Sequence, residues 1–332
     1  TLPSTLIFDY PTARQLAGFF EASAAPAETK ASPAAKVSGD GPTKTMSSSV
    51  VRLSGMSVIS PKGTISIDGL RRMASCATGC TTEVPLDRWV LDEGVTSDET
   101  VAKRVRFGGF VNNVELFDNK FFAISPAEAA AMDPQQRLLL EGGYEALHAA
   151  SLEKAAIMNC VVGVFVGISA NDWADVIRAT PMAKSVYSAT GSAHSIASGR
   201  ISFALGLLGP CVTYDTACSA ALSANHAGLR AIQMNECVSG LVSGVSLMLL
   251  PGMSISFGTA GMTSPNGKCH TFDKRADGYC RAEACCSFAL RTNDVKGAVT
   301  LPVLGSAVRQ DGKSASLTAP SGAAQAGLLH AA

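Results

Sequence analysis

Residues 211–233 read CVTYDTACSAALSANHAGLRAIQ, and this stretch predicts a strand that turns directly into a helix. A short run with β-branched and aromatic residues ends at Tyr214. Residues 219–233 contain no proline and are rich in alanine and leucine, which predicts a buried helix. Cys218 is therefore expected at the helix start, where unpaired N–H groups and the helix dipole stabilise negative charge. A thiol at such a position is a candidate nucleophile for acyl chemistry.

Position alone leaves the role of this thiol open. The chain has ten cysteines, and free cysteines are among the most buried residues, so most of them are expected to be inert. Cys76 and Cys80 form a C-x3-C pair without a second pair of ligands, which argues against zinc. The sequence has no G-x-S-x-G elbow, phosphate-binding loop or dinucleotide-binding glycine fingerprint. We therefore expect neither a metal nor a directly bound cofactor.

Composition narrows the remaining classes of protein. Of 332 residues, 47% are hydrophobic, and 27 basic residues balance 27 acidic ones. The hydrophobic fraction excludes global disorder, and the neutral charge argues against a nucleic-acid partner. Residues 237–267 carry no charge, but their six Ser, six Gly and two Pro predict a buried strand and a loop rather than a membrane span. We expect a soluble, intracellular protein that is cytoplasmic, with a plastid as the alternative.

The rest of the chain alternates between strand and helix patterns. Residues 126–150 predict a helical region in which Pro134 starts the second segment. Alternating strands and helices predict a mostly parallel or mixed sheet in a layered α/β domain. The segments that we expect to form strands are residues 51–56, 160–168, 212–214, 241–249 and 287–290. Residues 160–168 form a near-continuous apolar run, which predicts a strand covered on both faces, and we expect the last three segments to be similarly buried.

Five blocks of this sequence resemble the β-ketoacyl synthase (ketosynthase) domains of modular type I polyketide synthases. Residues 215–222 read DTACSAAL, similar to the family signature D-T-A-C-S-S-S-L around the reactive cysteine. Two further family landmarks precede it at residues 117–141 and 190–210, and two come after it at residues 260–279 and 305–320, in the order found in the family.

The resemblance implies a thiolase-like fold of αβαβα layers and a homodimer. Its first half is expected to be complete at residues 49–250 and its second half partial at residues 251–332. Residues 1–20 are similar to the closing helix of an acyl carrier domain. Residues 21–48, with hardly any large apolar side chain, are expected to be a flexible linker.

The resemblance also implies an acyltransferase of the 3-oxoacyl-[acyl-carrier-protein] synthase type. By analogy, Cys218 takes an acyl chain from a carrier thioester, and a malonyl-type carrier thioester then loses CO2 and condenses with it. The partners would be acyl carrier domains, whose phosphopantetheine holds the substrates. Phe257 and Met262 fall where the family lines its acyl pocket, although ordinary core packing is the favoured alternative for both.

Two departures from the family leave other functions open. The two histidine motifs needed for condensation lie beyond Ala332, so the fragment itself is expected to be inactive. His226 cannot replace them, because it lies two helical turns, about 12 Å, beyond Cys218. Ala282, Ala284 and Cys286 stand where the family usually has glycine. The alternatives are therefore a fatty-acid synthase ketosynthase and a non-condensing scaffold domain that dimerises.

Overall fold

The structure is a computed structural model, and Lys44–Ala332 forms one compact unit in it. The expected carrier helix at residues 1–20 and the expected linker at residues 21–48 lie outside the described residues. The residues that the structure describes are 50–91, 96–292, 300–314, 316 and 319–332.

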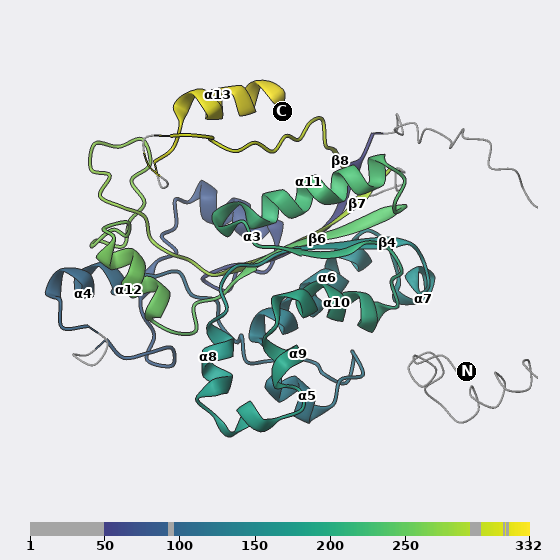
Figure 1. Ribbon diagram of the computed structural model, residues 1–332, viewed down its shortest axis with the longest axis horizontal. Coiled ribbons are helices and arrows are strands. Elements are labelled where there is room, and N and C mark those ends of the chain that lie inside the picture. The colour runs from purple at the N-terminus through teal and green to yellow at the C-terminus, as the bar shows by residue number, and fades with distance from the viewer. Residues whose placement is uncertain (1–49, 92–95, 293–299, 315, 317–318) are drawn as a thin grey trace, which may run out of the picture. The chain divides into compact units, whose positions relative to one another are not determined.

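A mixed sheet organises the unit (Figure 1). Its strands are β1 (Arg52–Ile59), β4 (Val162–Gly167), β5 (Cys211–Tyr214), β6 (Ser239–Ser246), β7 (Ala284–Arg291) and β8 (Leu301–Pro302). Their order across the sheet is β5-β4-β6-β7-β1-β8. β4 pairs parallel with β5 and β6, whereas β7 pairs antiparallel with β6 and β1. The predicted mixed α/β sheet is confirmed. β7 lies after the expected boundary at residue 250 yet joins this sheet, and the boundary itself stays a prediction.

The strands β4 and β5 differ in how far they are covered. Every residue of β4 is buried, as its continuous apolar run predicts for a strand with helices on both faces. A buried strand was also expected at residues 212–214, and this prediction is wrong, because Val212 is exposed and Thr213 and Tyr214 are half-buried. The physical reason is topological, because β5 lies at the edge of the sheet with β4 as its neighbour.

Three long helices cover the two faces of the sheet (Figure 1). The helices α6 (Pro134–Ala149) and α10 (His194–Leu205) pack on one face, and α11 (Ala220–Gln233) packs on the other. The predicted second helical segment begins at Pro134, as expected. The side chain of Asp133 caps it by accepting a hydrogen bond from the backbone N–H of Gln135 at 2.8 Å.

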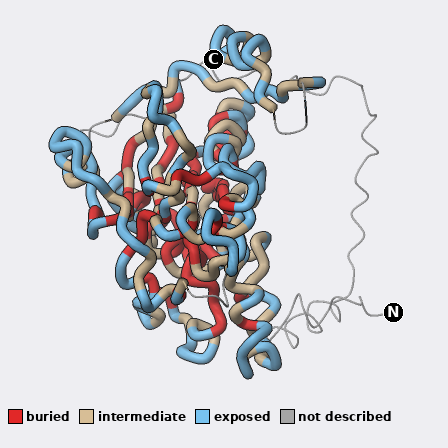
Figure 2. The backbone as a smooth tube through the Cα atoms, turned by 90° about the vertical axis from the view of Figure 1, so that its left-hand side faces the viewer, coloured by how far each residue is buried: buried red, intermediate tan, exposed pale blue. Residues whose placement is uncertain are grey.

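The hydrophobic core follows the alternation of the strands, whose successive side chains point to opposite faces. Val164 and Val166 belong to the cluster beneath α6 and α10, whereas Phe165 packs with Leu229 and Ile232 of α11. Figure 2 shows the buried residues gathered in the middle of the unit, between exposed outer segments.

Shorter elements connect these layers. They are α3 (Ile67–Ser75), β2 (Thr82–Glu83), α4 (Glu99–Val105), β3 (Phe107–Gly108), α5 (Pro126–Ala131), α7 (Lys154–Ile157), α8 (Asp172–Arg178), α9 (Ser188–Ser192), α12 (Gly252–Thr259) and α13 (Gly322–Ala331), with 3-10 turns η1 (Pro181–Lys184) and η2 (Ala217–Ser219). The uncharged residues 237–267 form β6 followed by α12, so a helix replaces the expected loop. Within the described ranges, no helix has the length and apolarity to cross a bilayer.

Candidate active site

Cys218 lies where β5 turns into α11, as the sequence predicts. β5 ends at Tyr214, the 3-10 turn η2 covers Ala217–Ser219, and α11 begins at Ala220. The Cys218 side chain is exposed. An exposed sulfur at the start of a 14-residue helix is accessible to a thioester that approaches from solvent.

The residue before Cys218 has a left-handed backbone conformation. Ala217 has a φ of 53°, a region in which residues other than glycine cost about 1–3 kcal/mol. Neighbouring side chains hold the turn in place. Asp215 Oδ1 accepts a hydrogen bond from the Ala217 N–H at 3.0 Å, and Ser219 Oγ donates to the Thr216 carbonyl at 2.9 Å. The turn is thereby fixed, and with it the direction in which the Cys218 side chain leaves the backbone.

Two glycines of the sheet allow α11 to begin so close to it. A Cβ placed on Gly167, the last residue of β4, would lie 2.4 Å from the backbone N of Ala221. A Cβ on Gly244 of β6 would lie 2.7 Å from the Ala221 Cβ. Because β4 and β6 are parallel, both glycines stand near the carboxyl ends of their strands. Cys218 therefore lies at the edge where open α/β sheets commonly bind their ligands.

Tyr279 is an aromatic neighbour of Cys218. Burial raises the pKa of the Tyr279 hydroxyl, the positive charge of Arg281 lowers it, and negative charge on the Cys218 sulfur raises it. The phenol of Tyr279 therefore lies within electrostatic range of the Cys218 sulfur. The Tyr279 side chain is 41% exposed, so it remains accessible at the surface beside the thiol.

Phe257 and Arg281 complete a group around Tyr279, which we call the aromatic wall (Phe257, Tyr279 and Arg281). The ring centroids of Phe257 and Tyr279 are 6.4 Å apart. The guanidinium of Arg281 lies 5.3 Å from the Phe257 centroid, and its Nη1 donates to Ser254 Oγ at 2.7 Å. Sequence reasoning found Phe257 but missed Tyr279 and Arg281, whose positions in the block at 260–279 and just after it were the available signal.

Met262 contacts the same group through its backbone. Its carbonyl oxygen accepts a hydrogen bond from the Tyr279 N–H at 3.0 Å, and its side chain is 42% exposed. Core packing was the favoured alternative for Phe257 and Met262, and the structure places Met262 at the surface and Phe257 in a half-buried position. Their place in an acyl pocket stays a prediction.

A buried carboxylate, Glu283, ties together the segments next to the aromatic wall. Its Oε2 accepts hydrogen bonds from the Val111 N–H at 2.7 Å and from Arg88 at 3.0 Å. Its Oε1 accepts from the Met248 N–H at 2.8 Å. Burial raises the pKa of Glu283, and the two backbone donors and Arg88 oppose that rise. The residue thus joins three distant parts of the chain two positions after Arg281.

The three positions where the family usually has glycine accept their side chains without backbone strain. Ala282, Ala284 and Cys286 are not among the described residues with positive φ. Ala284 and Cys286 are regular members of β7 and pair with β6. Ala282 packs against Gly109, where a Cβ would approach the Ala282 Cβ to 2.9 Å. Glycine at position 109 therefore leaves room for the side chain at position 282.

His148, His194 and His226 have side-chain partners other than Cys218. His226 Nδ1 is 2.9 Å from Ser306 Oγ, and burial followed by the charge of Arg230 lowers the His226 pKa. His148 pairs with Glu153. In the part of the chain that the structure describes, no hydrogen bond joins a histidine to Cys218.

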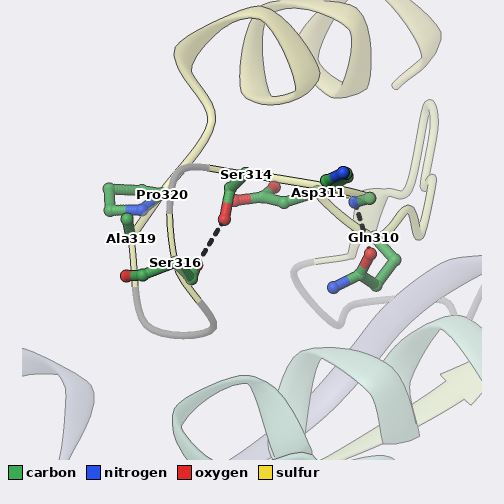
Figure 3. A pocket seen from close by; sticks show the side chains of 8 residues that line it. Gln310, Asp311, Ser314, Ser316, Ala319 and Pro320 are labelled. Atoms are coloured by element: carbon green, nitrogen blue, oxygen red, sulfur yellow. Dashed lines mark hydrogen bonds between the residues drawn. The ribbon is translucent and has the colours of Figure 1, made fainter.

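Other pockets and clusters lie apart from these residues. Among the described side chains, no three His, Cys, Asp or Glu residues are arranged to hold a metal ion. A cavity of about 480 Å³ is formed by the segment that connects β8 to α13 along the chain (Figure 3). Its lining comes from the segment 310–320 and includes neither Cys218 nor the aromatic wall. Asp311 closes one side by accepting a hydrogen bond from the Ser321 N–H at 2.8 Å.

Two bacterial polyketide synthases are similar to this chain in sequence. The mycocerosic acid synthase-like polyketide synthase of Mycolicibacterium smegmatis is 40% identical over 251 residues, which are 74% of this chain and 12% of that protein. The polyketide synthase GfsB of Streptomyces halstedii is 38% identical over 335 residues, which are 98% of this chain and 6% of that protein. The chain therefore spans only a small part of these relatives.

A solved structure shares the fold as well as the sequence pattern. The ketosynthase from module 6 of the bacillaene synthase of Bacillus subtilis 168 superposes with a TM-score of 0.72 and 31% identity, covering 84% of this chain and 47% of that one. The predicted thiolase-like fold is thus confirmed. The model of the β-ketoacyl synthase N-terminal domain matches residues 48–295. With that match over most of its length, the chain belongs to the β-ketoacyl synthase family.

Proposed function

We propose that this chain is part of the ketosynthase of a modular polyketide synthase and that Cys218 is its acyl-carrying nucleophile. The observation that carries the proposal is the exposed Cys218 thiol on the left-handed turn before α11. The relatives named above are polyketide synthases, which supports this reaction class over other uses of a thiol.

The first step would be transfer of an acyl group to Cys218. The thiolate attacks the carbonyl carbon of an acyl thioester, a C–S bond forms, and the carrier thiol leaves with the proton that Cys218 gave up. Phe257 and Met262 would line the pocket that receives the acyl chain.

The second step would extend the chain by two carbons. A malonyl-type thioester loses CO2, and the electron pair of the broken C–C bond forms an enolate. The enolate carbon attacks the carbonyl of the Cys218 thioester, and Cys218 leaves as a thiolate. Both thioesters would arrive on the phosphopantetheine of acyl carrier domains, which are the partners that this chemistry requires.

The chain would also pair with a second copy of itself. β5 is the edge strand of the described sheet, so one row of its backbone hydrogen-bonding groups faces away from β4. Apolar side chains are exposed near this edge, with Phe203 at 89% and Leu208 at 65% exposure. An exposed strand edge flanked by apolar side chains is typical of a surface that pairs with an identical strand.

Acylation by a small thioester tests the first step. The protein is incubated with hexanoyl-N-acetylcysteamine, digested with trypsin and analysed by tandem mass spectrometry. We expect one hexanoyl group on the peptide 201–230, and it should be released by hydroxylamine because it is a thioester. This peptide also contains Cys211, so Cys211→Ser serves as the matched control and should still be acylated. Cys218→Ala should lose the label.

Two outcomes would overturn the assignment. One is acylation of Cys211 with no label on Cys218. The other is equal acylation of Cys218 and of exposed Cys76, because a nucleophile placed by its turn should react faster than an ordinary exposed thiol.

A further inference from the structure

Cys269 and Cys280 are neighbours in space although they are 11 positions apart in the chain. The backbone N–H of Cys280 donates a hydrogen bond to Cys269 Sγ at 3.1 Å, and that sulfur is 3.9 Å from the Cys280 carbonyl oxygen. Because an N–Cα bond is about 1.46 Å long, the Cys280 Cα lies within about 4.6 Å of the Cys269 sulfur. The Cys269 sulfur therefore lies next to the residue that carries the second thiol, as the formation of a disulfide requires.

The two thiols differ in their surroundings. Cys269 is exposed, so it is the thiol that an oxidant in solution can reach. Cys280 is half-buried, and burial raises the pKa of its thiol to about 11. The Cys280 sulfur now lies 3.7 Å from the Arg281 carbonyl oxygen, and rotation about its Cα–Cβ bond redirects it.

We propose that Cys269 and Cys280 form a reversible disulfide, with a small disulfide such as oxidised glutathione as the oxidant. The Cys269 sulfur attacks one sulfur of glutathione disulfide, which gives a mixed disulfide and one reduced glutathione. The Cys280 sulfur then attacks the Cys269 sulfur and displaces the second reduced glutathione. The two protein thiols lose two electrons and two protons, and one glutathione disulfide becomes two thiols.

The bond would act on the neighbourhood of Cys218 through Tyr279. Residues 270–279 form the loop between the two cysteines, and Tyr279 is its last residue. The Tyr279 N–H donates to the Met262 carbonyl at 3.0 Å, and the Tyr279 carbonyl accepts from the Ser264 N–H at 2.9 Å. A disulfide at the adjacent position would tie the base of this loop, so the aromatic wall would lose freedom of movement on oxidation.

Peptide mapping under non-reducing conditions tests the bond. The folded protein is equilibrated in glutathione buffers of increasing oxidised fraction, quenched in acid and digested with trypsin after thiol blocking at low pH. Trypsin places Cys269 in the peptide 269–274 and Cys280 in the peptide 276–281. We expect these peptides to be joined by a disulfide at least about tenfold more often than any other pair, because adjacent thiols react intramolecularly.

Single substitutions separate this mechanism from unspecific oxidation. Cys280→Ser should stop the reaction at the mixed disulfide, with glutathione retained on Cys269, and Cys269→Ser should leave Cys280 largely reduced. Cys76→Ser, at an exposed thiol elsewhere, is the matched control and should not change the linked fraction. The proposal is overturned if the folded protein carries glutathione on Cys269 with Cys280 still reduced, or if its linkages are spread over other pairs. Because this readout is a covalent bond between two peptides, it does not depend on the activity proposed for Cys218.

Discussion

Replacement of Gly167 by alanine should displace the turn that carries Cys218. The added Cβ would lie 2.4 Å from the Ala221 N and 2.5 Å from the Ala220 carbonyl carbon. Both neighbours are backbone atoms of the first turn of α11, so neither can rotate out of the way. The start of α11 has to move by about 1 Å to reach an ordinary contact of about 3.5 Å.

The size of the effect follows from that movement. Overpacking by one methyl group costs about 1–3 kcal/mol of unfolding free energy, and each kcal/mol lowers Tm by about 2–4 °C in domains of about 150–250 residues. A displacement of about 1 Å can reduce a reaction rate by about 100-fold when geometry limits it. Gly167→Ala is therefore expected to slow acylation of Cys218 far more than a modest loss of stability would.

Thermal melting and the acylation assay described above check both effects. Gly199→Ala is the matched control, because Gly199 lies in α10 with no atom within 4 Å of the built Cβ. Alanine there should raise stability by up to about 1 kcal/mol, since it favours helix more than glycine does. If folded Gly167→Ala acylates Cys218 at the rate of Gly199→Ala, Gly167 does not position the nucleophile.

Two further predictions concern buried carboxylates. Burial raises the pKa of Asp133 from 3.8 to about 6, so the folded protein binds this proton more tightly than the unfolded chain does. The stability gained from the bound proton is fully present below pH 3.8 and is lost as the pH rises through 6. At about 1.4 kcal/mol per pKa unit, urea unfolding should show that the stability of Asp133→Asn changes less with pH than that of the parent, by about 2 kcal/mol between pH 4 and 7. An identical pH dependence in the two proteins would contradict this. Glu283→Gln should reduce the free energy of unfolding by about 3–5 kcal/mol, because Arg88 then stays buried without its anion. Glu99→Gln, which removes an exposed ion pair with Lys103, should leave Tm unchanged, and an equal loss in both variants would rule out a special role for Glu283.

Local sequence patterns were sufficient to predict much of the fold and the position of Cys218 between a strand and a helix. Continuous burial of β4 followed from an uninterrupted apolar run, and the start of α6 followed from Pro134 and its preceding Asp133. The turn at Cys218 followed from the change of pattern between Tyr214 and the alanine-rich helix. In each case the interaction that forms the element lies within a few residues, so the order of residues along the chain contains it.

Contacts between distant segments required the folded chain. The edge position of β5 depends on which strands pair with β4, and no local pattern encodes that choice. Tyr279 comes within electrostatic range of Cys218, and Cys269 contacts Cys280, only because segments separated in sequence converge in space. Short-range periodicity reflects which side of an element is buried, whereas the neighbour on that side is selected by the packing of the whole domain.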